Sequence, residues 1–437
     1  MIYSNLEFLV AFPFFCALFW LIPAHRARLA ALLVASLAFY AYGEPFGIPL
    51  LVGVGALAWG AGLLIGAHRA RARLIAAAAI AALVGDLALF KLSGALPLGI
   101  SFYTFEAIAY VVDVLRGAAP VERSPLRLGL FVSVFPHLIS GPIMRPNDIL
   151  PRLARGFRFD AATFASGIEL FVEGMAKKRL LADTAGIVAD SVFADPAGAS
   201  TARAWVGVLA YTAQIYGDFA GYTDMGRGIA RMLGFELPLN FAAPYTATSI
   251  RDFWRRWHIS LSSWLRDYLY IPLGGDRKGH ARTYFNLMVT MALGGLWHGA
   301  GPTFVLWGCY HGALLALERL TGWLGRLPAA MAGAVTFFLV VNGWALFRAH
   351  DLGTATEIFR ALYGMRDGAP ASTSLLIAGV GPLAVILAGM IAARVRPALL
   401  GHARAFDAVH GMAYALAIWV IFFAAPAPTQ PFIYFRF

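Results

Sequence analysis

The sequence is poor in cysteine and in charged residues. It has two cysteines in 437 residues, and 14% of its residues are charged, whereas a soluble domain carries roughly 25%. Cys16 and Cys309 both lie in apolar runs, so neither a disulfide scaffold nor a CxxC metal site is indicated. The low charge excludes an ordinary soluble globular protein of this length.

Several motifs of soluble enzymes are also missing. The chain has no GxSxG nucleophile motif, no Walker-type phosphate loop and no GxGxxG dinucleotide loop. Its histidines show no HxxxH spacing, so the sequence predicts no metal site. A net charge of +11 would suggest nucleic-acid binding in a soluble protein. In a membrane protein clustered Lys and Arg mark cytoplasmic loops, so we predict membrane lipids and no nucleic acid as partners.

Long apolar runs dominate what is present. Hydrophobic residues make up 59% of the chain, and the mean hydropathy is +0.68. We therefore predict an all-α polytopic membrane protein with about 11 transmembrane helices, since a helix of about 20 residues crosses the hydrocarbon core. The apolar runs are 6–22, 29–42, 46–66, 74–92, 98–115, 128–141, 164–176, 205–222, 284–297, 303–317, 329–347, 375–393 and 409–425.

The basic loops predict an orientation. The first run has no Lys or Arg before it and a basic segment after it, which favours a retained first span with its N-terminus outside. Basic segments also follow the third and fifth runs, so the ends of the odd-numbered runs should be cytoplasmic. Run 128–141, the sixth, breaks this alternation, because arginines follow it as well. It contains Pro136 and Gly141, and we expect a re-entrant hairpin surrounded by protein.

The segment 251–312 carries two histidines of interest. Residues 252–268 fit a single amphipathic helix at the cytoplasmic interface, with its aromatic side inward. The predicted apolar face comprises Trp254, Trp257, His258, Leu261, Trp264, Leu265 and Tyr268. His258 should be neutral there, because desolvation disfavours the charged imidazole. Its chemistry leaves open a functional residue or an interfacial anchor that satisfies a backbone carbonyl.

The second histidine, His298, lies between Gly-rich flanks that end in Pro302, so we expect it at a bend between two helices. A neutral imidazole there could act as a general base toward a hydroxyl, or be a core residue bonded across helices. We interpret His311 as structural. Asp218 and Asp224, beside an apolar run, are predicted to form structural ion pairs.

Seven blocks in order resemble one family. They are LPLGISFYTFEAIAYVVDVLRG (96–117), FPHLISGPIMRPNDILPRL (135–153), GMAKKRLLAD (174–183), QIYGDFAGYTDMGRGIARMLGFELPLNF (214–241), DFWRRWHISLSSWLRDYLYIPLGG (252–275), GGLWHGAGPTFVLWGCYHG (294–312) and GWALFRA (343–349). In these blocks the chain resembles the membrane-bound O-acyltransferases (MBOAT), and among them the membrane subunits of bacterial alginate O-acetylation. It departs from the family pattern at Gly217, where a Phe is usual; this could widen a cavity.

The resemblance implies a single membrane domain built around a central tunnel, with N-terminal spans in 1–95, a catalytic core in 96–320 and C-terminal spans in 321–437. It implies that His298 is the essential catalytic residue and that His258 has a supporting role. Acetyl-CoA or another acyl donor arrives as a substrate from the cytoplasm, with no permanently bound cofactor. We predict that Trp254, Arg255, Arg256 and Trp257 bind this donor.

The resemblance further implies a bacterial inner-membrane enzyme that moves acetyl groups toward an extracytoplasmic polysaccharide, often through a periplasmic acetyltransferase of the SGNH type. A D-alanyl transferase for a cell-wall polymer is an alternative. A non-enzymatic acyl or sugar transporter is another, and it would use charged residues at the membrane midplane such as Asp86, Lys91 and Glu106. The sequence does not name the glycan.

Overall fold

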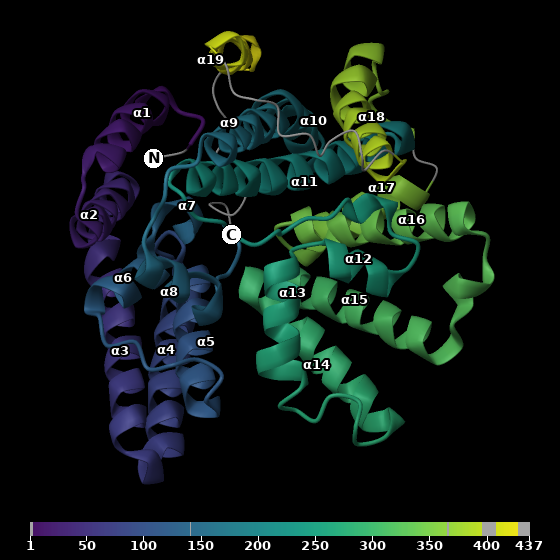
Figure 1. Ribbon diagram of the computed structural model, residues 1–437. Coiled ribbons are helices and arrows are strands. Elements are labelled where there is room, and N and C mark those ends of the chain that lie inside the picture. Colours follow the sequence, from purple (N-terminus) through teal and green to yellow (C-terminus); the bar gives the residue numbers. More distant parts are fainter. Residues whose placement is uncertain (1–2, 140, 365–366, 396–407, 427–437) are drawn as a thin grey trace. The chain divides into compact units, whose positions relative to one another are not determined.

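A computed structural model describes residues 3–139, 141–364, 367–395 and 408–426. These residues form helices and loops, and their only β-type pairing is an isolated bridge between Ala199 and Ala369 (Figure 1). The all-α prediction is confirmed.

Most of the long helices follow the predicted apolar runs, whereas the helices at Pro146–Arg155, Asp183–Phe193 and Leu352–Tyr363 lie outside those runs. The first half contains α1 (Leu6–Leu21), α2 (His25–Gly43), α3 (Ile48–Ala67), α4 (Ala72–Ser93), α5 (Ile100–Arg116), α6 (Pro125–Ser133), α7 (Phe135–Leu138), α8 (Pro146–Arg155), α9 (Ala161–Ala176), the π-helix η3 (Lys177–Ala182) and α10 (Asp183–Phe193). The second half contains α11 (Thr201–Met232), α12 (Ile250–Arg256), α13 (Ile259–Leu265), the π-helix η5 (Arg266–Tyr270), α14 (His280–His298), α15 (Pro302–Thr321), α16 (Ala329–Arg348), α17 (Leu352–Tyr363), α18 (Thr373–Val395) and α19 (Ala408–Ala424). Short 3₁₀ turns lie at Pro45–Gly47, Arg69–Arg71, Pro244–Thr246 and Trp323–Arg326.

The chain packs as two compact units. The first contains Met1–Gly174 and Tyr222–Leu239, and the second contains Met175–Gly221 and Asn240–His402, while the C-terminal segment is divided between them. The division into 1–95, 96–320 and 321–437 stays a prediction.

Four helical segments in the described residues are long and apolar enough to cross a membrane. They are Pro45–Ala67, Arg69–Ser93, Ala329–Arg348 and Thr373–Ala393. Large apolar side chains on these and neighbouring helices point outward; Leu74 is 70% exposed and Phe14 on α1 is 74% exposed. Such exposure is unfavourable in water and favourable against lipid tails, as expected for a membrane protein.

In the first unit, α3, α4 and α5 pack side by side (Figure 1). The run predicted as a re-entrant hairpin is a broken helix, with α6 and α7 separated at Val134 just before Pro136. Glu106 of α5 reaches this segment: its Oε1 lies 3.1 Å from His137 Nδ1 and accepts a hydrogen bond from the Met144 N–H. Glu106 therefore stabilises the broken helix. Because its carboxylate is engaged in these contacts, the structure does not favour the midplane charge pairing expected of a transporter.

In the second unit, a buried ion network joins η3, α10 and α11. Lys178 Nζ lies 2.8 Å from both Asp183 Oδ1 and Asp218 Oδ1, and Arg179 Nη1 lies 2.8 Å from Asp183 Oδ2. Opposite charges balance within the network, which is the condition for burying ions at tolerable cost. The structural interpretation of Asp218 is confirmed, and so is that of Asp224, whose carboxylate lies 3.3 Å from Arg227 in the first unit.

Gly217 lies where α11 passes η3. A Cβ at this position would lie 3.0 Å from the Lys177 carbonyl oxygen and 3.2 Å from the Ala182 Cβ. The glycine therefore permits close packing of helix on helix, and the wider cavity suggested by the sequence is not found at this residue.

The prediction of one continuous helix over 252–268 is wrong. The chain forms α12, breaks at Trp257 and His258, and resumes as α13 and η5. Periodicity could not reveal the break, because it is imposed by hydrogen bonds from residues 240–242.

Candidate functional site

The site begins with the way α12 is held at both ends. Ser249 caps its first turn by accepting a hydrogen bond from the Asp252 N–H, and the Glu318 carboxylate accepts one from the Ile250 N–H. These contacts satisfy donors that a helix N-terminus leaves unpaired. At the other end the Arg256 carbonyl accepts a hydrogen bond from the Ala242 N–H, outside the helix.

His258 occupies the break between α12 and α13. Its φ of 44° and ψ of 55° place a non-glycine residue in the left-handed region, a conformation that persists only where its surroundings enforce it. Asn240 stabilises this conformation. Its backbone carbonyl accepts a hydrogen bond from the Ile259 N–H, and its side-chain Oδ1 lies 3.2 Å from His258 Nδ1. Hydrogen bonds to Arg256 before the break and to Ile259 after it therefore fix the backbone that carries the His258 side chain.

The imidazole of His258 is buried among rings. It is 0% exposed, and its ring centroid lies 4.7 Å from that of Phe219 and 5.8 Å from that of Trp297. His258 lies outside the four candidate spans. Burial lowers the pKa of His258 to about 3, because an imidazolium would lose its hydration there. The ring is neutral at pH 7, as the sequence predicted.

His298 is the last residue of α14. The next residue, Gly299, is extended, and α15 starts at Pro302, so the predicted bend is confirmed. A Cβ on Gly295 would overlap the Phe304 carbonyl oxygen, which means that the glycine lets α14 and α15 approach backbone to backbone. This close approach fixes the position of His298 relative to α15.

Aromatic rings surround His298 on several sides. Its ring centroid lies 5.0 Å from that of Phe347 and 5.3 Å from that of Trp307. The His258 centroid lies 6.5 Å away, and the two rings are inclined at 60°. The structure thus brings together the two histidines that are 40 residues apart in the sequence.

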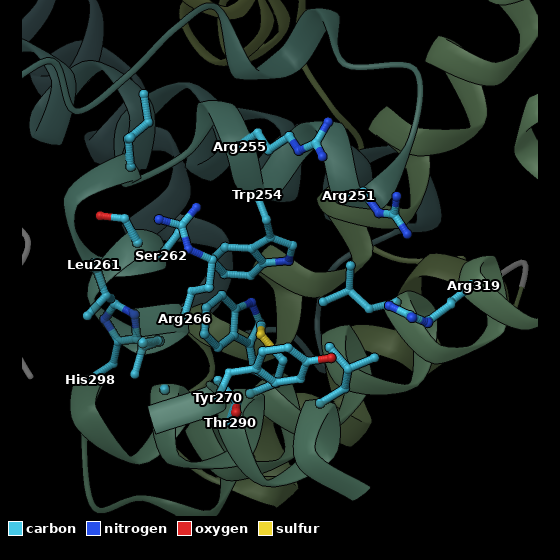
Figure 2. Close-up of a pocket in the computed structure, with 18 residues that line it drawn as sticks. Arg251, Trp254, Arg255, Leu261, Ser262, Arg266, Tyr270, Thr290, His298 and Arg319 are labelled. Atoms are coloured by element: carbon cyan, nitrogen blue, oxygen red, sulfur yellow. The ribbon is translucent and has the colours of Figure 1, made fainter. Parts of the chain in front are cut away.

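A cavity of about 460 Å³ opens beside His298. It is walled by side chains from α12, α13, η5, α14 and α15, which are mostly apolar. Figure 2 shows His298 on one wall and four guanidinium groups elsewhere around the pocket. These belong to Arg251, Arg255, Arg266 and Arg319. An apolar chamber with a histidine and several cations could hold a ligand that has an apolar or acyl end and an anionic end.

The predicted donor-binding residues divide into two pairs. Trp254 and Arg255 line the cavity. Arg256 lies outside the lining, with its Nε 2.9 Å from Asp252 Oδ1. Trp257 is 2% exposed and packs on Trp344 at a centroid distance of 4.7 Å. The last two therefore support α12 in this structure.

Other residues of the site were not identified from the sequence. Arg251 and Arg319 line the cavity, but they lie 68 positions apart and only the packing of α12 on α15 unites them. The hydrogen bonds between Asn240 and residues 258–260 left no mark in the local sequence pattern. Arg251 alone had a local signal, since it lies one helical turn before Arg255.

His311 is buried behind the cavity wall, 5.2 Å from the Trp254 ring centroid and 5.1 Å from that of Trp307. It does not line the cavity, and its structural interpretation stays a prediction. In the part of the chain that the structure describes, no three His, Cys, Asp or Glu residues gather as metal ligands.

Comparison with known proteins places these features in a family. The model of the membrane-bound O-acyltransferase family, MBOAT, matches residues 121–344, which include both histidines and every residue that lines the cavity. The probable alginate O-acetylase AlgI of Pseudomonas putida is 42% identical over 84% of this chain and 81% of its own length. The peptidoglycan O-acetyltransferase of Helicobacter pylori is 37% identical over 62% of this chain and 57% of its own.

A more distant relative is the teichoic acid D-alanyltransferase of Bacillus subtilis, which is 29% identical over 57% of this chain and 68% of its own length. The family match covers half of the chain, and the identity to the AlgI protein extends across most of it. The chain is therefore a membrane protein that belongs to the membrane-bound O-acyltransferase family, and its enzymatic activity is O-acyl transfer.

Proposed function

We propose that this protein is an inner-membrane O-acetyltransferase that moves acetyl groups from a cytoplasmic donor toward an extracytoplasmic polysaccharide. The observation that carries the proposal is the position of His298, on the wall of a cavity that also exposes four arginines. Relatives with 42% and 37% identity bear the names of an alginate O-acetylase and a peptidoglycan O-acetyltransferase, which supports an acetyl group and a glycan acceptor.

His298 acts as general base in the proposed reaction. It accepts the proton of the attacking hydroxyl while the hydroxyl oxygen forms an ester bond with the acetyl carbon. The carbon–sulfur bond of a thioester donor breaks, and the proton passes from His298 to the leaving thiolate. The products are an acetyl ester and a free thiol, so atoms and charge balance. His258, 6.5 Å away between ring centroids, positions His298 or the donor.

The donor is proposed to be acetyl-CoA or another acyl thioester that carries phosphate. Guanidinium groups bind phosphate through charge-assisted hydrogen bonds. Arg266 and Arg319 each lie near one carboxylate, Asp267 at 2.6 Å and Asp276 at 3.5 Å. The four arginines still outnumber these two acids, so the cavity retains net positive charge for an anionic donor. The donor binds as a substrate and not as a permanent cofactor.

The remaining topology and partners are part of the same proposal. We place about 11 spans in the bacterial inner membrane, of which four are long apolar helices here. A periplasmic SGNH-type acetyltransferase would pass the acetyl group to the polysaccharide. Transfer of D-alanine is the alternative; the D-alanyltransferase relative is less similar, at 29% identity.

The test uses purified protein in proteoliposomes with radiolabelled acetyl-CoA and an oligosaccharide with free hydroxyl groups as the acetyl acceptor. The wild type should consume acetyl-CoA and release free CoA, while His298→Ala should not, although it elutes as a folded protein in detergent. His280→Ala is the matched control, because His280 lies at the exposed start of the same helix and its loss should leave activity intact. Undiminished turnover by His298→Ala, or no reaction of the wild type with acetyl-CoA, would overturn the proposal.

A further inference from the structure

Asn240 makes an unusual set of contacts for a residue in a loop. It is 0% exposed. Its backbone carbonyl accepts a hydrogen bond from the Ile259 N–H at 3.0 Å. Its side-chain Oδ1 accepts hydrogen bonds from the Ser260 N–H at 3.2 Å and from the Ser260 hydroxyl at 2.9 Å. The same oxygen lies 3.2 Å from His258 Nδ1.

The orientation of this side-chain amide is fixed by chemistry. A backbone N–H can only donate a hydrogen bond, so the amide atom that faces the Ser260 N–H must be the oxygen. Rotating the amide by half a turn would place its NH₂ group against that N–H, donor against donor. The oxygen is therefore the atom that His258 Nδ1 meets.

The orientation of Asn240 in turn decides the tautomer of His258. An amide oxygen has no hydrogen to donate, so Nδ1 must carry the hydrogen that joins the two. In a neutral imidazole with hydrogen on Nδ1, the basic lone pair is on Nε2. The rings described around His258 are those of Phe219 from α11 and of Trp297 and His298 from α14. Among these three rings only His298 is titratable.

We propose that Asn240 is a positioning residue for acyl transfer, which holds His258 in the tautomer whose proton-accepting nitrogen is Nε2. This inference rests on the proposed function, because it assigns His258 a chemical role next to His298. Loss of the Asn240 oxygen would free the imidazole to adopt the other tautomer, in which Nε2 carries hydrogen and no longer accepts a hydrogen bond. At metal sites, removal of a partner that orients a histidine in this way changes affinity or activity by about 10–100-fold, and we expect a loss of similar size here.

Two variants of Asn240 separate this role from a merely structural one. Asn240→Asp keeps an acceptor for Nδ1–H but adds a buried charge, while Asn240→Leu has similar volume and no acceptor. The positioning role predicts that kcat for acetyl-CoA is higher in Asn240→Asp than in Asn240→Leu, even though the Asp variant is the less heat-stable in detergent. A structural role predicts that kcat follows stability, with Asp the worse, and that order would overturn the inference.

A double-mutant cycle with His258→Gln gives the second readout. Asn240→Leu should lower kcat about 10–100-fold in the wild-type background and by much less when His258 is already absent. Equal losses in the two backgrounds would contradict the inference. Such a result would leave the proposed function standing, because that function fails only if His298→Ala remains active or the wild type does not use acetyl-CoA.

Discussion

The two histidines of the site both lie at breaks between helices, but the breaks are built differently. At His258, a loop captures the backbone with hydrogen bonds, and the residue is held at a φ of 44°. At His298, glycines let two helices meet closely, and the chain turns through Gly299 to Pro302. His298 lines the cavity, whereas His258 lies behind it. Polar contacts thus fix the orientation of the His258 ring, and close packing of two helix backbones fixes the position of His298.

The largest effect should come from the histidines themselves. We expect His298→Ala to lower kcat by about 10²–10⁴-fold, the contribution of a positioned general base. His258→Gln should cost less, because it removes a supporting residue. Turnover of acetyl-CoA by both variants, at matched protein concentration, would measure the ratio. A greater loss for His258→Gln would reverse the roles assigned to the two rings.

A second prediction tests the close packing of α14 on α15, which positions His298. Gly308→Ala would place a Cβ against the Met291 carbonyl oxygen, and overpacking of this kind costs about 1–3 kcal/mol. The melting temperature in detergent should fall. Gly85→Ala, on α4 with nothing within 4 Å of the added Cβ, is the control and should melt no lower than the wild type. Equal melting of both variants would contradict the packing described for Gly308.

A smaller effect is expected for the cavity arginines. Arg251→Ala and Arg319→Ala should each raise KM for acetyl-CoA by about threefold to tenfold, since a charge-assisted contact contributes about 1 kcal/mol when partly exposed. The increase should shrink in high salt. Arg282→Ala, exposed on α14 outside the cavity, should leave KM unchanged. A rise in KM for this control would show that overall charge, and not the cavity, binds the donor.

The last prediction concerns the pH dependence of folding stability. Burial lowers the pKa of His258 to about 3, while the unfolded chain has a histidine pKa near 6.5. Below about pH 6.5 the unfolded state therefore binds a proton that the folded state does not, and folding stability falls by up to about 1.4 kcal/mol per pH unit. Denaturation of detergent-solubilised protein between pH 7 and 5 should show a shallower loss for His258→Gln. Identical slopes would mean that His258 takes up its proton equally in both states.

Much of the fold was accessible from local pattern. Apolar runs placed most of the long helices within a few residues, because the removal of apolar surface from water dominates where a helix lies. The exception is α11, which continues past its run of 205–222 to Met232. The Gly and Pro residues around His298 predicted its bend, since those residues restrict the backbone locally. Pattern failed at 252–268, where the amphipathic period continues through a break. The hydrogen bonds that cause this break come from Asn240, 18 positions earlier than His258.

The candidate site divides in the same way. Both histidines, Trp254 and Arg255 were predicted from their segment and from family resemblance. Arg319 was not, because its only link to the site is the packing of α15 beside α12. Arg256 and Trp257 looked equivalent to their neighbours in sequence, yet Asp252 and Trp344 engage them outside the cavity.

The sequence by itself determined that this chain is a helical membrane protein and which residue types could carry acyl transfer, because composition, periodicity and motifs are properties of neighbouring residues. Only the tertiary structure decided which side chains meet. The 6.5 Å approach of two imidazoles, the arginines around one cavity and the tautomer set by Asn240 all depend on contacts between distant segments. Such contacts are selected by packing and hydrogen-bond geometry in three dimensions, which no local pattern encodes.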